Sequence, residues 1–484
     1  MKRREFLQVG GMAAAGLMLG GPGRAADRPN VLLLMVDQMR RPRWFPKDAP
    51  LPAYDRLRRE GLAFTNHFVS CVPCSASRAT LFTGRHMPQH KVEVNAQRFS
   101  ARRSRYSFGP ELDPSIPTLG HIFSAAGYKT PYLGKWHLSY TGDAATPDLT
   151  RYGFTDWQGP DHFGAPREGL RWDHAFADQT LAWLDAHGRQ GPWFLTCSLI
   201  NPHDICFFSR RAPRAAIVPD VCDRVPDNFH DDLKGKPRIQ HDWRRLWGRL
   251  YGTEFMTERK CRHYIDLYYY LQLKAEEQLN RVLDALDRLG LADNTLVVLF
   301  SDHGDMVGSH RLMSKGPYVY HENNQVPFVL RWPGRIPAGA EARALVQSVD
   351  IFPTLLGLVG LDHDCSALSG KSLMPAIANP SAAGINDHVL MAWGYGRDGY
   401  NETGRMFLQP EVKAPSQLRA IYDGRYKYAR YFDPGVPEEY ELYDLANDPL
   451  EMRSLARDQG YRALQREMSD HLREAEAAEM APLK

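Results

Sequence analysis

The sequence lacks the features that mark several large classes of protein. Its 484 residues include only seven cysteines, too few for a fold held together by disulfide bonds, and the odd count leaves at least one thiol without an intramolecular partner. Sixty lysine and arginine residues stand against 57 aspartate and glutamate residues, a near balance that argues against a nucleic-acid-binding protein. Outside the first 26 residues, no apolar run approaches the roughly 18 residues that a membrane-spanning helix needs. Composition therefore predicts a soluble globular protein of catalytic size, with no nucleic-acid partner.

The first 26 residues have the pattern of an export signal. Arg3 and Arg4 precede Phe6-Leu7 and a weakly hydrophobic, glycine- and alanine-rich stretch over residues 9–21. This pattern resembles the signal of the bacterial twin-arginine pathway, and small residues at 23–26 offer a cleavage point. No cysteine follows directly, so we expect no lipid anchor and no stable membrane anchor. The sequence predicts a signal peptide over residues 1–26 and a periplasmic mature protein.

Three short apolar runs end abruptly at polar residues. Residues 31–36 run into Asp37 and Gln38, residues 194–200 into a segment with His203, and residues 296–300 into Asp302 and His303. Continuous apolar runs of this length suit strands buried on both faces of a parallel sheet. Residues 130–133, before Lys135 and His137, are a weaker candidate for a strand, because Pro131 cannot donate a backbone hydrogen bond.

Helical patterns between these runs complete an alternating order of strands and helices. One pattern includes residues 279–286 and precedes Gly290, and a shorter one begins near Pro52 and stops at Gly61. Such alternation predicts a large, doubly wound, mostly parallel sheet flanked by helices. Ligands bind such sheets beyond the carboxyl ends of the strands, where we expect Asp37, His203, Asp302 and His303 to meet.

The C-terminal part has a different pattern. Asp423-Gly424 lies between strand-like residues and predicts a hairpin turn. A further strand over residues 441–445 and a final helix with Leu464, Met468 and Leu472 follow. We expect a smaller α+β subdomain with an antiparallel sheet over residues 381–484, after a catalytic α/β domain over residues 27–380.

The most informative segment lies at residues 71–85. It contains Cys74-Ser-Ala-Ser-Arg78 followed by Leu81-Phe-Thr-Gly-Arg85. This pattern closely resembles the signature of the type I sulfatases, within the alkaline phosphatase-like superfamily. Cys71 is out of frame, because Ser75 stands where its arginine would be needed. The resemblance continues in the expected order through residues 134–138, 202–203, 301–304, 349–354 and 442–445, and so covers nearly the whole mature chain.

The resemblance implies that Cys74 is oxidised to formylglycine by a maturation enzyme. The hydrated aldehyde attacks sulfate through one hydroxyl, and the other hydroxyl then expels sulfate, which divides a difficult reaction into two easier steps. Ala76 stands where proline is commoner in the family, so the enzyme that modifies Cys74 and the extent of conversion stay open. Taken alone, Cys71 and Cys74 also match a redox pair or a disulfide, but Arg78 and Arg85 favour the sulfatase interpretation.

The same resemblance implies a divalent cation and a set of catalytic residues. Its metal ligands are Asp37, formylglycine at position 74, Asp302 and His303, with Gln38 in place of a second aspartate; calcium is the first choice, with manganese or magnesium as alternatives. The catalytic residues it implies are Cys74, Arg78, Lys135, His137, His203 and Lys315. Arg78 holds the diol, Lys135 and Lys315 contact the sulfate, His137 lies beside the nucleophile, and His203 protonates the leaving group. Asn95 is a further candidate for substrate contact.

Basic and aromatic residues interleave over residues 207–260, including Arg210, Arg211, Arg214 and the segment 241–249. The pattern suits a lid over an anionic substrate, and it suits a solvated amphipathic helix better.

We therefore predict an exported sulfatase that hydrolyses sulfate monoesters of a carbohydrate or of an aryl or alkyl alcohol. One alternative in the same superfamily is a phosphonate monoester or phosphodiester hydrolase. Another is a non-catalytic binder of sulfated glycans in which Cys74 stays unmodified.

Overall fold

A computed structural model describes residues 28–42, 46, 49–98, 107–139, 148–162, 164–207, 218–251, 256–382, 384–394 and 411–482. The predicted signal peptide lies outside these residues, as do Arg210, Arg211 and Arg214. Within the described ranges, no helix combines the length and the apolar character needed to cross a bilayer.

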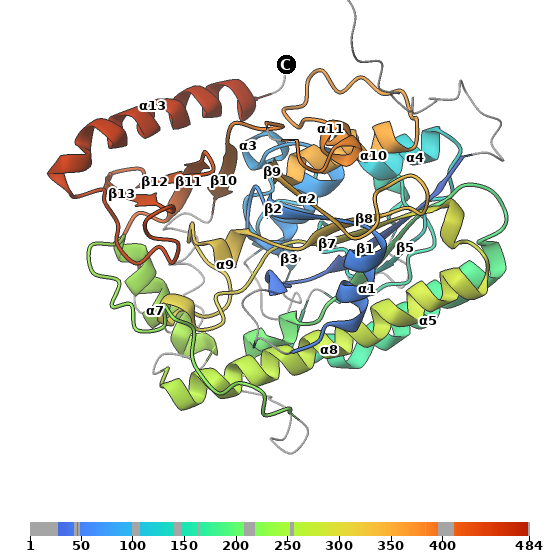
Figure 1. Cartoon of the computed structure of the whole chain (residues 1–484), viewed down its shortest axis with the longest axis horizontal. Coiled ribbons are helices and arrows are strands. Elements are labelled where there is room, and N and C mark those ends of the chain that lie inside the picture. Colours follow the sequence, from blue (N-terminus) through green and yellow to red (C-terminus); the bar gives the residue numbers. More distant parts are fainter. Residues whose placement is uncertain are drawn as a thin grey trace, which may run out of the picture.

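A seven-stranded sheet forms the centre of the larger part of the molecule (Figure 1). Its strands lie in the order β5 (Tyr132–Gly134), β6 (Phe194–Leu199), β1 (Asn30–Val36), β7 (Thr295–Ser301), β8 (Phe328–Arg331), β2 (Leu62–Phe68) and β9 (Ala340–Gln347). Only β8 runs antiparallel to its neighbours. The predicted mostly parallel sheet is confirmed, and the run weakened by Pro131 forms only the three-residue β5.

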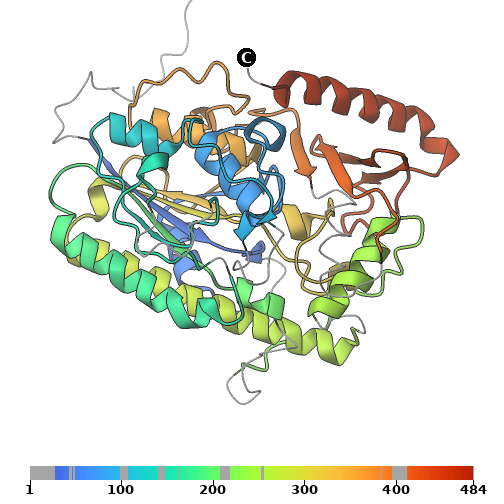
Figure 2. The ribbon, with the colours of Figure 1, turned by 180° about the vertical axis from the view of Figure 1, so that it is seen from behind.

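Alternating side chains of β1 face two separate layers of helices. Val31, Leu33 and Met35 pack in one hydrophobic cluster, while their neighbours Leu32 and Leu34 pack in another, as the two-residue period of a strand requires. Helices α2 (Cys74–Thr83), α4 (Leu119–Ala125), α10 (Ile351–Leu358) and α11 (Met374–Ala378) cover the first face. The second face is covered by α1 (Pro52–Glu60), α5 (Glu168–His187) and α8 (Glu258–Arg288), the last two side by side in both views (Figures 1 and 2).

Both predicted helices are confirmed. Proline occupies the first turn of α1, as its fixed φ favours. The apolar positions at 279, 282, 283 and 286 are buried on α8, whose N-terminus is capped by the Thr257 hydroxyl. The amphipathic interpretation of residues 241–249 is also confirmed: α7 (Arg238–Tyr251) buries Trp243 and Leu246 and exposes Arg245.

The remaining described elements are short: α3 (Met87–His90), α9 (His321–Asn324), β3 (Gln97–Arg98), β4 (Ser107–Phe108), η3 (Thr150–Tyr152), η4 (His203–Phe207), η6 (Ala292–Asn294), η7 (Ser309–Arg311), η8 (Ser348–Asp350) and η9 (Gln459–Tyr461).

A separate four-stranded antiparallel sheet forms the smaller C-terminal part. Its strands are β10 (Val389–Trp393), β11 (Gln417–Tyr422), β12 (Tyr426–Asp433) and β13 (Val436–Asp444), and α13 (Arg462–Glu479) packs Met468 and Leu472 against them (Figure 1). The predicted hairpin turn joins β11 to β12, with Gly424 at φ +95°. The Asp423 carboxylate accepts the N–H groups of Arg425 and Tyr426 and closes this turn. The α+β character is confirmed, and the boundary at residue 380 stays a prediction.

Buried ion pairs connect this smaller sheet to the central part. The Lys427 ammonium on β12 lies 2.7 Å from a Glu451 carboxylate oxygen and also donates to the Val319 carbonyl at 2.7 Å. The other Glu451 oxygen lies 3.1 Å from the His321 imidazole of α9. Burial alone would raise the pKa of Glu451, but the Lys427 charge and the bond to His321 hold it well below its usual range.

We expect Glu451→Gln to destabilise the protein by about 3–5 kcal/mol at neutral pH, because it leaves the Lys427 charge buried and unpaired. Since the folded pKa of Glu451 is depressed, its stabilising effect is complete above the unfolded value of about 4.3 and is lost as pH falls below it. Urea unfolding of both proteins at a series of pH values should therefore show that the difference between their free energies of unfolding becomes smaller in acid. The control is Asp470→Asn, which breaks an exposed pair with Arg473 on α13 and should cost less than about 1 kcal/mol. The expectation would be contradicted if both variants lost the same free energy of unfolding, or if the difference between Glu451→Gln and the wild type did not change with pH.

Candidate functional site

Four neighbouring strands end at the same edge of the central sheet. Because β5, β6, β1 and β7 are parallel and adjacent, their carboxyl ends meet there. Lys135 follows β5, His203 follows β6, Asp37 follows β1 and Asp302 follows β7. The structure thus brings together side chains that span more than 260 residues of sequence, as the rule for open α/β sheets predicts.

Cys74 is the first residue of α2, with Pro73 in the N-cap position. The helix dipole places partial positive charge at this end, which favours a developing anion. Arg78 lies four residues later, and the i, i+4 spacing puts both side chains on one face of the helix. Next to Cys74, the Ser75 hydroxyl donates to the His137 carbonyl at 2.5 Å, and the Ser75 N–H donates to the Asn95 side chain at 3.2 Å. The start of α2 is therefore fixed to two other predicted site residues.

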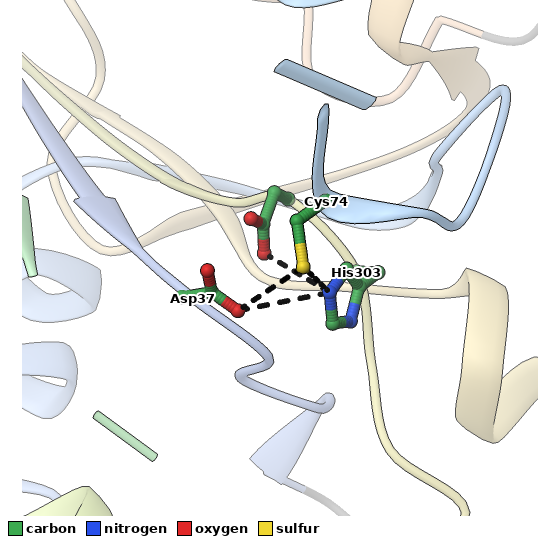
Figure 3. A group of neighbouring side chains, drawn as sticks. Asp37, Cys74 and His303 are labelled. Carbon is green, nitrogen blue, oxygen red and sulfur yellow. Dashed lines mark hydrogen bonds and ion pairs between the residues drawn. The ribbon is translucent and has the colours of Figure 1, made fainter. Parts of the chain in front are cut away.

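Four buried side chains converge on one point (Figure 3). One ligand atom from each of Asp37, Cys74, Asp302 and His303 lies within 4.8 Å of the others. The His303 Nε2 is 3.1 Å from the Cys74 Sγ and 3.7 Å from one oxygen of each aspartate. Its Nδ1 bonds the Gly304 carbonyl at 2.9 Å, and this contact directs Nε2 into the cluster. Two carboxylates and an oriented imidazole are donors that fit a divalent cation.

Arg78 holds the outer oxygens of both carboxylates. Its guanidinium lies 2.9 Å from the Asp302 Oδ2 and 3.2 Å from the Asp37 Oδ2, and all three side chains are fully buried. The Lys135 ammonium lies 2.5 Å from the same Asp37 oxygen. The Oδ1 atoms of the two aspartates therefore face the cluster while the Oδ2 atoms are neutralised by cations.

The electrostatics of the site favour anions at positions 37 and 74. Burial alone would raise the pKa of Asp37, but the charges of Lys135 and Arg78 hold it well below its usual range. Burial and the Asp37 carboxylate likewise act to raise the pKa of the Cys74 thiol, and Lys315 and Lys135 outweigh them, so that it lies below its ordinary value.

Gln38 lies beside the cluster and links it to Lys315. Its side-chain oxygen accepts a hydrogen bond from the Lys315 ammonium at 2.9 Å, and its side-chain nitrogen donates to Asp305 at 2.6 Å. The Gln38 backbone N–H donates to the inward oxygen of Asp302 at 3.0 Å. These contacts place Lys315 at the site, and the role of Gln38 as a metal ligand stays a prediction.

Both predicted catalytic histidines lie in tightly held turns. His137 has a positive φ of 59°, and its N–H and that of Trp136 donate to the Asp161 carboxylate at 2.7 and 3.0 Å. His203 begins η4, just beyond β6. Burial and then the nearby lysine charges hold the pKa of both imidazoles well below the usual range, so both rings are neutral near pH 7.

Cys71 does not pair with Cys74. All seven cysteines are free thiols. The Cys71 Sγ lies 3.3 Å from the Thr80 hydroxyl, and burial raises the pKa of this thiol to about 12. The structure thus gives no support to a disulfide or a redox pair at this position.

Sequence reasoning missed several carboxylates that support the site. Asp161, Asp173 and Asp305 lie outside every motif, and Asp204 received no role although it directly follows His203. Each accepts hydrogen bonds from backbone N–H groups or from Gln38. Backbone contacts of this kind leave no characteristic spacing, so the signals were the adjacency of Asp204 to His203 and that of Asp305 to the motif at residues 301–304.

Comparison with known proteins agrees with this geometry. A family model described as Sulfatase matches residues 29–361, and the C-terminal model of N-sulphoglucosamine sulphohydrolase matches residues 308–478. The chain is 28% identical to a Delta 4,5-hexuronate-2-O-sulfatase of Bacteroides thetaiotaomicron, over 92% of this chain and 88% of that protein. It is also 28% identical to the multifunctional alkaline phosphatase superfamily protein PehA of Trinickia caryophylli, over 91% of this chain and 93% of that protein.

Solved structures have the same fold. A 2-O GAG sulfatase superposes with a TM-score of 0.74 at 24% identity, covering 93% of this chain and 92% of that chain. The phosphonate monoester hydrolase of Agrobacterium radiobacter superposes with a TM-score of 0.72 at 25% identity, covering 93% of this chain and 96% of that chain.

The four-donor cluster generates a test of metal binding. We expect Ca²⁺, Mn²⁺ or Mg²⁺, added to chelator-treated protein, to raise its melting temperature, because an ion at 100 times its Kd stabilises by about 2.7 kcal/mol. Asp302→Asn should abolish the rise, since it removes a charged donor. The control is Asp266→Asn: this buried carboxylate accepts the backbone N–H groups of Val221 and Cys222 and lies on α8, outside the cluster. An undiminished rise in Asp302→Asn would refute the metal assignment.

Proposed function

Given that this chain belongs to the sulfatase family and is a sulfuric ester hydrolase, we propose that it hydrolyses sulfate monoesters through a formylglycine at position 74 and a bound divalent cation. The observation that carries the proposal is the start of α2, where Cys74 enters a buried cluster of two carboxylates and an oriented imidazole. The Cys74 thiol lies among side chains that could bind a metal ion, and Arg78 lies one helical turn away. This position suits a cysteine that is converted to a different nucleophile.

Two groups would add their own chemistry to this site. Formylglycine, produced from Cys74 by a maturation enzyme, would supply a hydrated aldehyde whose hydroxyl is the nucleophile. A divalent cation held by Asp37, Asp302, His303 and residue 74 would neutralise sulfate oxygens; we favour Ca²⁺, with Mn²⁺ suited to the imidazole donor and Mg²⁺ as a further alternative.

The remaining roles belong to side chains of the chain itself. Lys135 and Lys315 bind the sulfate oxygens as compact positive charges, and Arg78 holds Asp37 and Asp302 in place. His203 donates a proton to the departing alcohol oxygen, and His137 lies beside the nucleophile. Burial is the first cause of the lowered pKa of His203, and the Lys315 and Lys135 charges come second; an anionic ester bound between the lysines would offset this second cause.

The names of the relatives support a sulfated carbohydrate or small alcohol as the substrate class. They include the hexuronate-2-O-sulfatase and a choline-sulfatase of Rhizobium meliloti, 27% identical over 89% of this chain. A second candidate, phosphonate monoester or phosphodiester hydrolysis, is favoured by the likeness to the Agrobacterium hydrolase. A non-catalytic glycan binder requires that Cys74 stays a thiol.

We expect the peptide containing residue 74 to be about 18 Da lighter than its thiol form after co-expression with a maturation enzyme. The modified protein should release sulfate from sulfate monoesters faster than it cleaves phosphonate monoesters or phosphodiesters. Cys74→Ala should lower sulfate release by at least about 10³-fold, because no nucleophile remains.

Cys71→Ala is the matched control, since it removes another buried cysteine only three residues away and should retain activity. Faster cleavage of phosphonates or diesters would move the assignment to the second candidate. A peptide that remains entirely thiol, together with inactive protein, would favour the glycan binder.

We further propose export to the periplasm by the twin-arginine route, on the residues Arg3, Arg4, Phe6 and Leu7. Replacing both arginines with lysine should retain the full-length chain in the cytoplasm, as followed by immunoblotting of cell fractions. Glu5→Gln, within the same segment, should leave export unchanged. Equal periplasmic amounts of the lysine variant and the wild type would contradict this route.

A further inference from the structure

The loop that carries His203 is joined to α5 by a carboxylate on the helix. Asp173, in the second turn of α5, accepts the backbone N–H of Ile200 at 2.7 Å on one oxygen and that of Asn201 at 2.9 Å on the other. Asp173 is buried, and burial raises its pKa to about 8. A buried acidic group costs free energy unless it is hydrogen-bonded. The two hydrogen bonds of Asp173 to this loop supply that compensation and fix the loop against α5.

A second carboxylate makes the reverse contact, from the loop to the helix. Asp204 directly follows His203 and accepts the N–H groups of Gly169 and Leu170, at 3.2 and 2.8 Å. These groups belong to the first turn of α5, where N–H groups have no partner within the helix and the dipole favours negative charge. The two carboxylates thus fix the loop on both sides of His203.

The segment that leads into α5 lies against the imidazole itself. A Cβ placed on Gly164, which has a φ of +103°, would come within 2.5 Å of the His203 ring. The N–H groups of Gly164 and Ala165 donate to the Glu168 carboxylate at 2.8 and 2.7 Å, which fixes this turn. Gly169 likewise approaches the Asn201 side chain so closely that a Cβ would lie 2.5 Å from it. The His203 ring is therefore held by packing as well as by its backbone.

We propose that Asp173 and Asp204 are positioning residues for His203, which hold its imidazole where it can protonate the departing alcohol oxygen. This inference rests on the proposed function, in which His203 is the proton donor. Neither carboxylate touches substrate. They act because a proton donor must lie within hydrogen-bond reach of the leaving oxygen, and a displacement of about 1 Å costs on the order of 10²-fold in rate.

The test compares aryl sulfates whose leaving groups range from nitrophenol to phenol. Nitrophenolate departs without protonation, whereas the more basic phenolate needs an acid. In the formylglycine-containing enzyme, His203→Gln should lose activity in proportion to the basicity of the leaving group. Asp173→Asn and Asp204→Asn should do the same, with a loss of less than about 10-fold for nitrophenyl sulfate and about 10²-fold for phenyl sulfate.

Two controls separate positioning from general damage. Asp161→Asn weakens an equivalent carboxylate contact, to the Trp136 and His137 N–H groups, and should lower the rate by the same factor for every leaving group. Asp350→Asn alters a buried carboxylate that accepts the N–H groups of Gln347 and Lys371 elsewhere, and it should lower the melting temperature without leaving-group dependence. Gly164→Ala places a methyl group against the His203 ring and should show the same dependence of the rate loss on the leaving group. This variant tests the inference if an aspartate variant fails to fold.

Each outcome bears on a different part of the inference. Uniform losses in Asp173→Asn, Asp204→Asn and Gly164→Ala, alongside a leaving-group-dependent loss in His203→Gln, would overturn the positioning role alone. A uniform loss in His203→Gln would remove the proton donor and the positioning role with it. A wild-type enzyme that releases no sulfate from this series or from sulfated carbohydrates, and cleaves no phosphonate with the same leaving groups, would overturn both this inference and the proposed function.

Discussion

The Arg78 guanidinium lies between the carboxylates of Asp37 and Asp302, and all three side chains are fully buried. Two carboxylates brought this close inside a protein repel each other and lose their hydration, so the arrangement needs a compensating charge. Arg78 supplies it through its planar fork of donors, which can reach both groups and also bonds the Lys135 carbonyl and the Ser198 hydroxyl. Because Arg78 lies on the same face of α2 as Cys74, the contact that stabilises the carboxylates also places residue 74 against them.

The balance of charge at this site explains how it could bind a cation and an anion together. Asp37 and Asp302 are the two carboxylates of the donor cluster, while Arg78, Lys135 and Lys315 are basic side chains close to it. Gln38 contributes no charge of its own and accepts a hydrogen bond from Lys315. A divalent cation in the cluster would add further positive charge, so an anionic ester is favoured on electrostatic grounds.

The ends of β1, β6 and β7 could be predicted from the sequence, because a buried strand that stops at a polar residue leaves a clear pattern. The carboxyl-end rule then placed Asp37, His203 and Asp302 on one edge, and the Asp423-Gly424 pair located the C-terminal hairpin. The antiparallel direction of β8 could not be predicted, since it depends on pairing across the sheet rather than on local residues. The supporting carboxylates of Asp161 and Asp173 escaped for a similar reason: each binds backbone N–H groups more than 20 residues away, and a backbone group carries no sequence identity.

The smaller sheet also contacts the loop that carries Lys315, through aromatic packing. Trp393 of β10 contacts Trp243 of α7 edge to face, with ring centroids 5.6 Å apart. Trp243 in turn packs against Gly316, where a Cβ would come within 2.8 Å of the indole. Gly316 adjoins Lys315, so two aromatic rings connect β10 to the loop that carries this ammonium group. The Lys427–Glu451 pair belongs to the same smaller part of the molecule, and Glu451 contacts His321. His321 lies six residues after Lys315 in the chain. The C-terminal sheet is therefore linked by side-chain contacts to the loop that carries Lys315, and its packing supports the position of that loop.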